Sequence, residues 1–419
     1  MAMIRPETEM KDTGIEWIGN IPSSWVCCKQ KYVISLINGR AFKDTEFEED
    51  GKYRILRVGN LFSNPKWYSS NLELEDDKYC DNGDLLYAWS MSYGPYIWNG
   101  EKVIYHYHIW KAKLLNNLSK RFAYYYLIAL SDSIKSDVHE TTMSFITMKS
   151  MNNSYIAFPE DIFEQQAIAD YLDETCSKID EIIAEAKASI DEYKELKQSV
   201  IFEAVTKGLD KNVEMKQCSV NWLDEIPSTW ESIRLKYLLT EINNRSETGT
   251  EQPLSVSQVM GVVPSYMIAV ANPTASYVGQ KIVEPNDIVF NKLKAHLGVF
   301  FMSKYHGLVS PDYAVYRTND KVIPKYLEYL FHTSACISEF KKYISGVAEG
   351  LMRLYTSDLF NIRICLPKVD EQIKIVEYVE NKVELFDSLI SEKESLINDL
   401  EAYKKSLIYE VVTGKRRVV

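Results

Sequence analysis

The sequence lacks the features that mark membrane, secreted and zinc-binding proteins. No uninterrupted apolar run reaches the ~18 residues of a membrane-spanning helix, and no apolar segment near the first residue resembles a secretory signal. The seven cysteines are scattered, their number is odd, and none stands in a CxxC pair. Neither a disulfide framework nor a structural zinc site is therefore indicated. We expect a protein of the reducing cytoplasm that contacts no membrane.

The sequence also lacks the motifs of common nucleotide-dependent and DNA-modifying enzymes. It has no GxxxxGKS/T phosphate-binding loop, no (D/N)PP(Y/F) segment that clamps a target adenine, and no GxSxG nucleophile elbow. A glycine-rich cofactor turn and a nuclease-like carboxylate cluster followed by lysine are missing as well. We expect no catalytic residue, no metal site and no cofactor site in this chain.

The length and the charge distribution narrow the possibilities further. At 419 residues the chain is about three times the ~150 residues typical of one domain, so two or three folding units are expected. The net charge of -11 comes mainly from residues 159–211, whereas residues 26–158 and 231–366 are close to neutral. This distribution permits a local basic face on each near-neutral block without predicting one.

An internal repeat of about 205 residues organises the chain. IEWIGNIPSSW (15–25) returns as VNWLDEIPSTW (220–230), and we call these two stretches the tryptophan segments. Residues 164–206 align without a gap to residues 371–413, with 14 of 43 positions identical. Each half therefore contains a tryptophan segment, a large variable block and a conserved final stretch.

The final stretch of each half is predicted to be a long amphipathic helix. Neither glycine nor proline interrupts residues 160–206 or 368–412, and Gly208 and Gly414 follow as helix C-caps. Apolar residues recur at three- and four-residue steps, so the two stripes are expected to bury each other as a coiled coil. The stripes comprise Ile168, Leu172, Ile179, Ile182, Ala186, Ile190, Tyr193, Leu196 and Val200, and then Ile375, Val379, Phe386, Leu389, Leu396, Leu400, Tyr403 and Leu407.

The variable blocks, 26–158 and 231–366, are predicted to be mixed α/β domains. They are rich in β-branched and aromatic residues, and Gly, Asn, Asp and Pro separate their short alternating runs. The expected strands are YRILRV (53–58), KVIYHYHIW (102–110) and YAVYR (313–317), and the expected helices are RFAYYYLIAL (121–130) and PKYLEYLFHT (324–333).

These observations predict an α+β fold with an internal pseudo-twofold axis. Two repeat-related mixed α/β domains are separated by two long helices. Because the pseudo-twofold axis passes between these helices, they must run antiparallel, and we expect them to form a coiled coil. Two divergent heads held apart in this way suit a ligand with two spaced, roughly twofold sites, and double-stranded DNA is such a ligand. Because the heads share little sequence, they would read different half-sites of a bipartite, asymmetric target.

The chain resembles the specificity subunit of type I restriction-modification systems over nearly its whole length. The resemblance lies in the tryptophan segments and in stretches inside the blocks: GDLLYAWSMSYGPYIWNG (83–100), NDIVFNKLKAHLGVFF (286–301) and GLVSPDYAVYR (307–317). MKSMNNSYIAFPEDIFEQQ (148–166) and GVAEGLMRLYTSDLFNIRICLPKVDEQ (346–372) are similar to the closing strand and helix start of each repeat in that family.

This resemblance implies a domain order and a division of labour. It implies a first target-recognition domain with its tryptophan segment at 1–158, a spacer helix at 159–211, a second domain with its segment at 212–366, and a second spacer helix at 367–419. It further implies a non-catalytic subunit that binds two copies of a methyltransferase (modification) subunit and restriction/translocase subunits. S-adenosylmethionine and ATP would then belong to those partners, and this chain would hold no cofactor.

Polar side chains on loops are the candidates for reading bases and holding phosphates. The predicted DNA-binding residues of the first block are Arg40, Lys43, Arg57, Asn60, Ser90, Ser92, Tyr93, Thr141, Thr142 and Ser144. Those of the second block are Asn243, Arg245, Ser257, Gln258, Lys292, Lys294, His296, Glu349 and Arg353. Gly39 and Gly94 are expected to permit close backbone approach near the first set.

Several other residues have a structural and a functional interpretation. His106 and His108 alternate along a predicted strand, where ordinary strand positions or contacts near the DNA face are favoured over a metal pair. The recurrence of Trp17, Trp25, Trp222 and Trp230 beside proline favours packing over base stacking. Glu164, Gln165, Glu371 and Gln372 are expected to cap the helices and to make contacts between the repeats.

A function of another class stays open. The chain could be a coiled-coil adaptor that joins two protein partners without touching DNA, and the acidic helices and the net charge favour this slightly. Basic concave faces on the heads would indicate DNA binding, whereas apolar patches would indicate protein binding.

Overall fold

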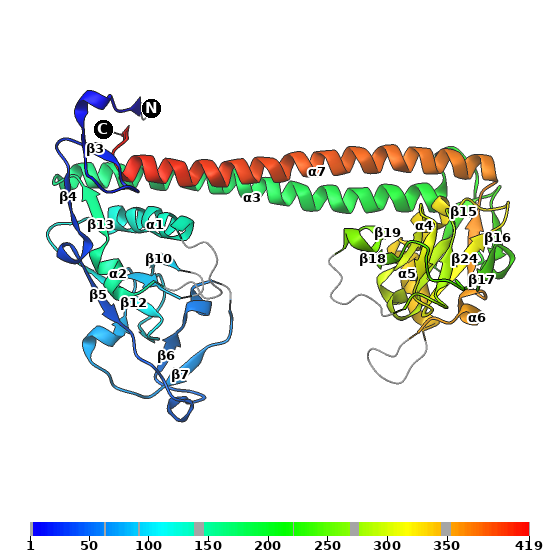
Figure 1. The fold of residues 1–419 in the computed structure, drawn as a ribbon, viewed down its shortest axis with the longest axis horizontal. Helices are drawn as coiled ribbons and strands as arrows, with labels where there is room; N and C mark the ends of the chain where they lie inside the picture. Colours follow the sequence, from blue (N-terminus) through cyan, green and yellow to red (C-terminus); the bar gives the residue numbers. More distant parts are fainter. Residues whose placement is uncertain are drawn as a thin grey trace. The chain divides into compact units, whose positions relative to one another are not determined.

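Two compact units make up the structure, a computed structural model that describes residues 3–62, 64–90, 93–137, 146–220, 222–268, 276–344 and 353–418. The first unit comprises Met1–Lys187 and Glu394–Val419, and the second comprises Ala188–Lys393. Each unit thus contains one end of each long helix, α3 (Ile162–Lys207) and α7 (Val369–Val412) (Figure 1). Among the described residues no helix has the length and apolar character needed to cross a membrane.

The described part of the first unit is built on two four-stranded sheets. In one, β5 (Ile34–Asn38), β12 (Ile109–Leu114), β9 (Leu85–Ala88) and β10 (Gly94–Ile97) are neighbours in that order and all antiparallel. In the other, the order is β7 (Tyr68–Ser70), β6 (Tyr53–Leu56), β11 (Val103–Tyr105) and β8 (Tyr79–Cys80), with β11 parallel to β6.

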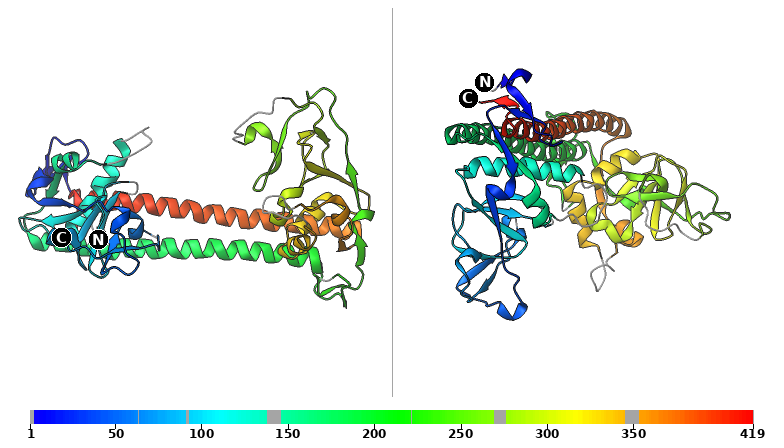
Figure 2. Two further views of the ribbon diagram at one scale, coloured as in Figure 1. Left: turned by 90° about the horizontal axis from the view of Figure 1, so that it is seen from below. Right: turned by 60° about the vertical axis from the view of Figure 1, so that its left-hand side comes forward.

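Shorter ladders and two helices complete the first unit. The ladders pair β1 (Met3–Ile4) with β26 (Arg416–Arg417), β2 (Met10–Asp12) with β3 (Asn20–Pro22), and β4 (Val26–Lys29) with β13 (Tyr155–Phe158). The helices are α1 (Lys120–Asp137) and α2 (Met148–Asn153). Helix α1 lies beside the start of α3, where Arg121 forms ion pairs with Asp170 and Asp173 (Figure 2).

The second unit repeats this plan with different details. Its four-stranded sheet has the order β17 (Leu239–Ile242), β24 (Tyr313–Thr318), β21 (Ile288–Asn291) and β22 (Phe300–Met302). The ladders pair β14 (Met215–Gln217) with β15 (Glu225–Pro227), β16 (Glu231–Arg234) with β25 (Arg363–Leu366), β18 (Leu254–Ser257) with β19 (Gly261–Pro264), and β20 (Lys281–Val283) with β23 (Gly307–Val309). The helices are α4 (Pro324–Phe331), α5 (Ser334–Lys342) and α6 (Thr356–Leu359).

Short 3-10 helices connect many of these elements. They are η1 (Glu7–Glu9), η2 (Gln30–Tyr32), η3 (Asp44–Glu46), η4 (Val58–Leu61), η5 (Asp76–Lys78), η6 (Leu235–Tyr237), η7 (Ser265–Met267) and η8 (Lys292–Leu297).

Most of the predicted local elements are confirmed, and one is wrong. The expected strand at 313–317 is β24, and the expected helices at 121–130 and 324–333 fall in α1 and α4. The run 102–110 is not one strand, because the chain turns between β11 and β12, where the Ile109 N–H donates to the His106 carbonyl (2.9 Å). His106 and His108 therefore lie at a turn and do not alternate along a strand.

Helices α3 and α7 pack against each other, and they run antiparallel in both units. In the first unit Lys404 Nζ is 2.6 Å from Asp180 Oδ2. In the second unit Lys197 Nζ is 2.6 Å from Asp387 Oδ1. The repeat alignment makes Lys197 equivalent to Lys404 and Asp180 equivalent to Asp387, so one contact occurs twice. The predicted fold class, two α/β domains with two long paired helices, is confirmed.

The predicted apolar stripes are wrong at several positions. Ile182 is 45% exposed and the adjacent Ile183 is buried; likewise Leu396 is 39% exposed and the adjacent Ile397 is buried. Where two apolar residues are consecutive, the spacing alone does not decide which one faces the partner helix. Two further positions of the predicted stripes are exposed, Leu196 (52%) and Tyr403 (47%).

The tryptophan segments are anchored to the starts of the long helices. Trp25 Nε1 donates to Glu164 Oε1 at 3.1 Å, and Trp230 Nε1 donates to Glu371 Oε1 at 3.2 Å. Both indoles are buried, at 1% exposure. Packing, the structural role predicted for these tryptophans, is confirmed, and we call each Trp–Glu pair a tryptophan junction.

The neighbouring glutamines bind backbone groups of the α/β blocks instead of capping the helices. Gln165 Oε1 accepts from the Ser119 N–H (2.7 Å) just before α1, while Gln165 Nε2 donates to the Pro159 carbonyl (2.8 Å). Gln372 makes the corresponding two bonds in the second unit. The helix-capping prediction is wrong here, because Asp161 accepts from the first turn of α3 instead.

The two ends of the chain meet in the first unit. Strand β1 pairs with β26, and the Arg5 N–H donates to the Lys415 carbonyl at 2.8 Å. The termini lie side by side in every view of Figures 1 and 2. Arg417 forms an ion pair with Glu9, and burial lowers the pKa of Lys415 to about 8.

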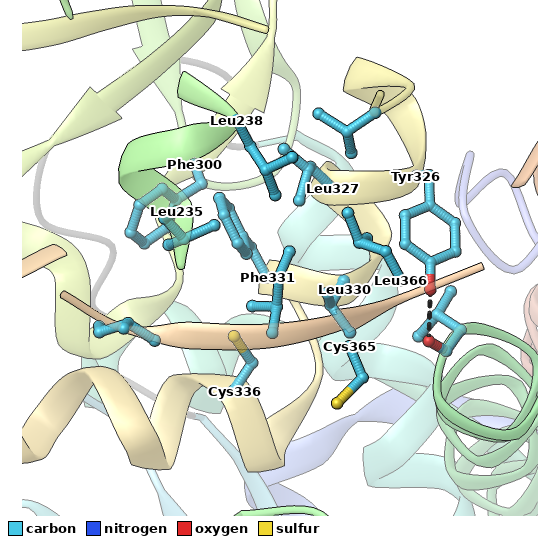
Figure 3. Packing of buried hydrophobic residues seen from close by; sticks show 14 of the residues in the cluster. Leu235, Leu238, Phe300, Tyr326, Leu327, Leu330, Phe331, Cys336, Cys365 and Leu366 are labelled. Atoms are coloured by element: carbon cyan, nitrogen blue, oxygen red, sulfur yellow. Dashed lines mark hydrogen bonds between the residues drawn. The ribbon is translucent and has the colours of Figure 1, made fainter. Parts of the chain in front are cut away.

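The core of the second unit extends from its sheet onto both long helices. Its cluster includes Val205 of α3 and Ile375 of α7 together with the aromatic residues of β22 and α4. Figure 3 shows the Tyr326 hydroxyl donating to the Val205 carbonyl, a bond of 2.8 Å that fixes α4 against the end of α3.

We expect the tryptophan junction of the second unit to stabilise that unit measurably. In Glu371→Ala the buried Trp230 indole N–H loses its acceptor, which costs about 1–3 kcal/mol of unfolding free energy. Glu371→Gln keeps an acceptor oxygen and loses only a favourable charge at the start of α7, so it costs less than about 1 kcal/mol. Urea denaturation of both variants tests this, and equal losses would contradict the role of the bond.

Candidate nucleic-acid interface

In the first unit the turn between β11 and β12 lies against the loop that follows β5. The Arg40 N–H donates to the Tyr105 carbonyl (3.0 Å), and the Tyr107 N–H donates to the Arg40 carbonyl (3.0 Å). A Cβ on Gly39 would clash with the Tyr105 carbonyl oxygen, so only glycine permits this approach. The atoms that approach Gly39 belong to the backbone of this turn, and its role beside a ligand stays a prediction.

The Arg40 guanidinium is held by its own loop. It binds Glu46 through both carboxylate oxygens, at 2.6 and 3.0 Å, and it lies over the Phe42 ring. The hydrogen bond from Arg40, followed by one from the Lys43 backbone, lowers the pKa of Glu46. Arg40 and Lys43 therefore shape the loop around η3, with the Lys43 side chain exposed.

Arg57 and His106 line a common cavity of about 380 Å³ in the first unit. Its wall is largely aromatic, and the Arg57 guanidinium lies 5.1 Å from the Tyr68 ring centroid. Burial, then the neighbouring His108 and Arg57, lowers the pKa of His106 to about 4. Both histidines are accordingly uncharged at neutral pH, since burial and Arg57 also lower the pKa of His108. His106 can therefore exchange hydrogen bonds with a ligand in the cavity while Arg57 supplies the charge.

The remaining predicted residues of the first block fall into three groups. The Asn60 side chain is engaged by its own loop, accepting from the Arg57 N–H and donating to two carbonyls. Ser90 and Tyr93 are half-buried next to β9 and β10, and burial raises the pKa of Tyr93. Four predicted residues lie outside the described residues: Ser92, Thr141, Thr142 and Ser144.

In the second unit three predicted residues meet at one cavity of about 710 Å³. Ser257, Gln258 and Lys294 line it together with tyrosines, among them Tyr266, whose side chain is 81% exposed. The Ser257 hydroxyl accepts from the N–H groups of the β18–β19 turn, which fixes the shape of that hairpin. Gln258 stands exposed on the same hairpin, and Lys294 is exposed on η8. The cavity thus combines an amide, an ammonium group and aromatic rings.

A basic group surrounds Glu241 beside this cavity. Lys281 and Lys292 approach Glu241 at 3.9 and 3.7 Å, and Arg245 donates to the Gly279 carbonyl at 2.8 Å. Lys281 is only 3% exposed, and burial, then Lys292, lowers its pKa. Lys281 was missed in the sequence because it stands in an apolar strand, QKIV, that shows no sign of a cluster. Glu241 thus faces two lysines, and Arg245 acts on the same Lys281.

The other predicted residues of the second block are more scattered. Asn243 is exposed after β17, and His296 is exposed on η8 beside Lys294. Arg353 is half-buried close to η8, since the Leu354 N–H donates to the Lys292 carbonyl (3.1 Å). Glu349 lies outside the described residues.

Two further features bear on the chemistry of the described residues, the metal-ligating side chains and the cysteines. Among them no group of three or more His, Cys, Asp or Glu side chains is placed to hold a metal ion. Burial raises the pKa of six cysteines: Cys27, Cys28, Cys80, Cys176, Cys336 and Cys365. Burial therefore keeps these thiols mostly protonated at neutral pH, which slows their reactions as nucleophiles.

Comparison with known proteins assigns both repeats to one family. The family described as "Type I restriction modification DNA specificity domain" matches residues 22–192 and again residues 227–401. The chain is 21% identical over 442 residues to the type I restriction enzyme EcoBI specificity subunit of Escherichia coli, covering 97% of this chain and 89% of that protein. It is 24% identical over 356 residues to the MjaVIII specificity subunit of Methanocaldococcus jannaschii, covering 81% and 80%.

Solved structures share the fold. A chain from a study of complex assembly in a type I R-M system has a TM-score of 0.67 at 13% identity, covering 94% of this chain and 99% of that chain. The HsdS subunit from Thermoanaerobacter tengcongensis has a TM-score of 0.53 at 15% identity, covering 94% and 98%.

The half-buried His106 makes the stability of the first unit depend on pH. Its pKa is about 4 in the folded chain and ~6.5 when unfolded. Between these values the unfolded chain binds a proton that the folded chain excludes, so the unfolding free energy falls as the pH drops from about 6.5 to about 4. We expect His106→Asn to flatten this dependence in urea titrations at several pH values. Equal slopes in wild type and variant would contradict the assignment, and above pH 7 the slopes should agree.

Proposed function

The chain belongs to the family of type I restriction-modification DNA specificity proteins, and we propose that it selects the DNA target of such a system. In this proposal each α/β domain reads one half-site, so the target is bipartite and asymmetric. The observation that carries the proposal is the cavity of the second unit, which gathers Ser257, Gln258 and Lys294 from two separate elements. Their chemistry matches that of DNA contacts.

The cavity residues can divide the work of recognition. The Gln258 amide has the donor and acceptor pair that an adenine edge requires, and the Ser257 hydroxyl accepts or donates to any base. Lys294, with the basic group around Glu241, suits phosphate oxygens. The exposed Tyr266 ring offers an apolar surface at the edge of the same cavity.

The first unit offers different chemistry, which supports an asymmetric target. Its cavity presents the exposed Arg57 beside the neutral His106 and aromatic rings, and none of the described residues that line it is a lysine. An arginine fork favours guanine in the major groove, whereas an amide favours adenine. Two domains with such different side chains would read two different half-sites.

In the proposed complex this chain binds the DNA and positions the partner subunits, and the partners carry out the chemistry. Two copies of a methyltransferase subunit would bring S-adenosylmethionine, and restriction/translocase subunits would bring ATP. Leu196 on α3 and Tyr403 on α7 occupy equivalent positions of the repeat, one in each unit, and both are about half exposed. Two equivalent apolar positions on the helices are what two copies of one partner require.

The same exposed positions also favour the rival function, an adaptor that joins protein partners without reading DNA. The helices expose further apolar side chains in the second unit, among them Leu385 (50%) and Ile373 (50%). Protein docking on the helices is compatible with both functions, so the two differ only in whether the α/β domains contact DNA.

Methylation mapped across a genome tests the DNA-reading role. We expect deletion of the gene to remove one bipartite methyladenine motif, and the wild-type gene to restore it. Gln258→Ala should relax or change bases in one half-site only, because each good bidentate contact is worth about 1–3 kcal/mol of discrimination. Single-molecule sequencing of native DNA reads the methylated positions in each strain.

Lys304→Ala serves as the matched control, since Lys304 is an exposed lysine of the same unit that does not line the cavity. It should restore the full motif. If an active methyltransferase partner is present and deletion changes no motif, the DNA-reading proposal fails and the adaptor function stands.

The number of bound methyltransferase subunits tests the scaffold role. We expect Leu196→Glu to reduce the complex from two copies to one, because a carboxylate replaces an apolar contact on one side only. Gln198→Glu places the same charge on α3 two residues away and should keep both copies. Native mass spectrometry of the purified complex counts the subunits, and two retained copies in Leu196→Glu would rule out this docking position.

A further inference from the structure

Two cysteines that are far apart in the sequence lie next to each other in the second unit. Cys218 follows β14, Cys365 lies in β25, and their Sγ atoms are 3.0 Å apart. Figure 3 shows Cys365 on the strand that borders the hydrophobic cluster. Neither the proposed DNA contacts nor the helix pairing uses these two side chains.

The two thiols differ in their access to solvent. Cys365 is 1% exposed, and burial, followed by its hydrogen bond with Cys218, raises its pKa strongly. Cys218 is only half-buried, and the Val220 N–H donates to its sulfur at 3.4 Å. Cys218 is therefore the sulfur that a small reagent can reach.

We propose that Cys218 and Cys365 form an oxidisable dithiol, a modification site that small-molecule disulfides such as oxidised glutathione convert into an intramolecular disulfide. The Cys218 thiolate attacks one sulfur of the reagent, a protein–glutathione S–S bond forms, and one glutathione thiolate leaves. Cys365 then loses its proton and attacks the Cys218 sulfur, which releases the second glutathione. One molecule of reagent is reduced to two thiols, and the two cysteines are oxidised together.

The backbone allows the sulfurs to close the remaining distance. A disulfide bond is ~2.05 Å long, so the sulfurs must approach by about 1 Å. Cys365 is fixed by the ladder with β16, where it pairs with Ser232. Cys218 lies in the connection between β14 and β15, outside both strands, so a small movement there suffices.

The site exists in one repeat only. The repeat alignment places Thr13 at the position of Cys218. Ala157 corresponds to Cys365, because Ala157 pairs with Cys27 across the first ladder as Cys365 pairs with Ser232 across the second. The first unit therefore has no counterpart, and oxidation would act on the second unit alone.

The bond would tie the second tryptophan segment to the strand that leads into α7. It closes a loop between residues 147 positions apart, which restricts the unfolded chain and favours the folded second unit. The anchoring of α7 would then become more resistant to unfolding under oxidising conditions.

Peptide mapping of the full-length protein tests the site. We expect treatment with oxidised glutathione, followed by alkylation and tryptic digestion without reductant, to yield residues 217–234 linked to residues 364–368, lighter by two hydrogen atoms than the sum of the peptides. The melting temperature of the oxidised protein should rise by several degrees, and dithiothreitol should reverse both changes.

Three single variants separate the steps. Cys365→Ser should accumulate glutathione on Cys218, because the resolving thiol is gone, and Cys218→Ser should protect Cys365 from modification. Cys27→Ser is the matched control, a half-buried cysteine of the other unit, and should still form the link. A persistent mixed disulfide on Cys218 in the wild type, a link between two chains, or reduced thiols at both positions would overturn the proposal.

Discussion

Each tryptophan junction brings three parts of the chain to one point, and the pairing of the long helices depends on it. The end of one helix, the tryptophan segment and the start of the other helix meet there. Gly414 (φ +73°) lies just beyond the end of α7, where a Cβ would clash with the Pro22 ring, and Gly208 (φ +76°) follows α3, where a Cβ would lie 3.0 Å from Glu371 Oε1. Only a residue without a side chain ends a helix against its neighbours in this way. Each unit thereby fixes the ends of both helices.

The two units achieve this with different chain connections. In the second, the chain runs without interruption from α3 through Gly208 into β14 and the tryptophan segment. In the first, the corresponding connection is made by contacts between the two ends of the chain: β1 pairs with β26, and Arg5 bonds to both Lys415 and Glu164. Ion pairs and a short ladder thus replace a peptide connection. The end of one helix is thus connected to the tryptophan segment by the chain itself in the second unit, and by tertiary contacts in the first.

The repeat made the architecture predictable, because identical residues at equivalent positions make equivalent contacts. The Lys–Asp ion pairs and the Trp–Glu hydrogen bonds each join residues that recur in both halves of the sequence. The local spacing of apolar residues did not predict the structure where it fitted more than one arrangement. Neighbouring apolar residues such as Ile182 and Ile183 leave the phase of a helix open, and the turn at His106 is hidden in a run that alternates like one strand. In each case the structure is determined by contacts between residues that are distant in the sequence.

Whether a polar loop residue can read DNA is likewise decided by its neighbours and not by its type. Asn60 uses its amide within its own loop, and Arg40 is bound by Glu46, although both are residue types that read bases. Gln258 and Lys294 are exposed and line a common cavity, so their side chains are open to a ligand. The buried junctions tolerate little change, whereas such positions can vary at small cost in stability. Under the proposed function, substitutions at such positions would change the DNA target and leave the pairing of the long helices unchanged.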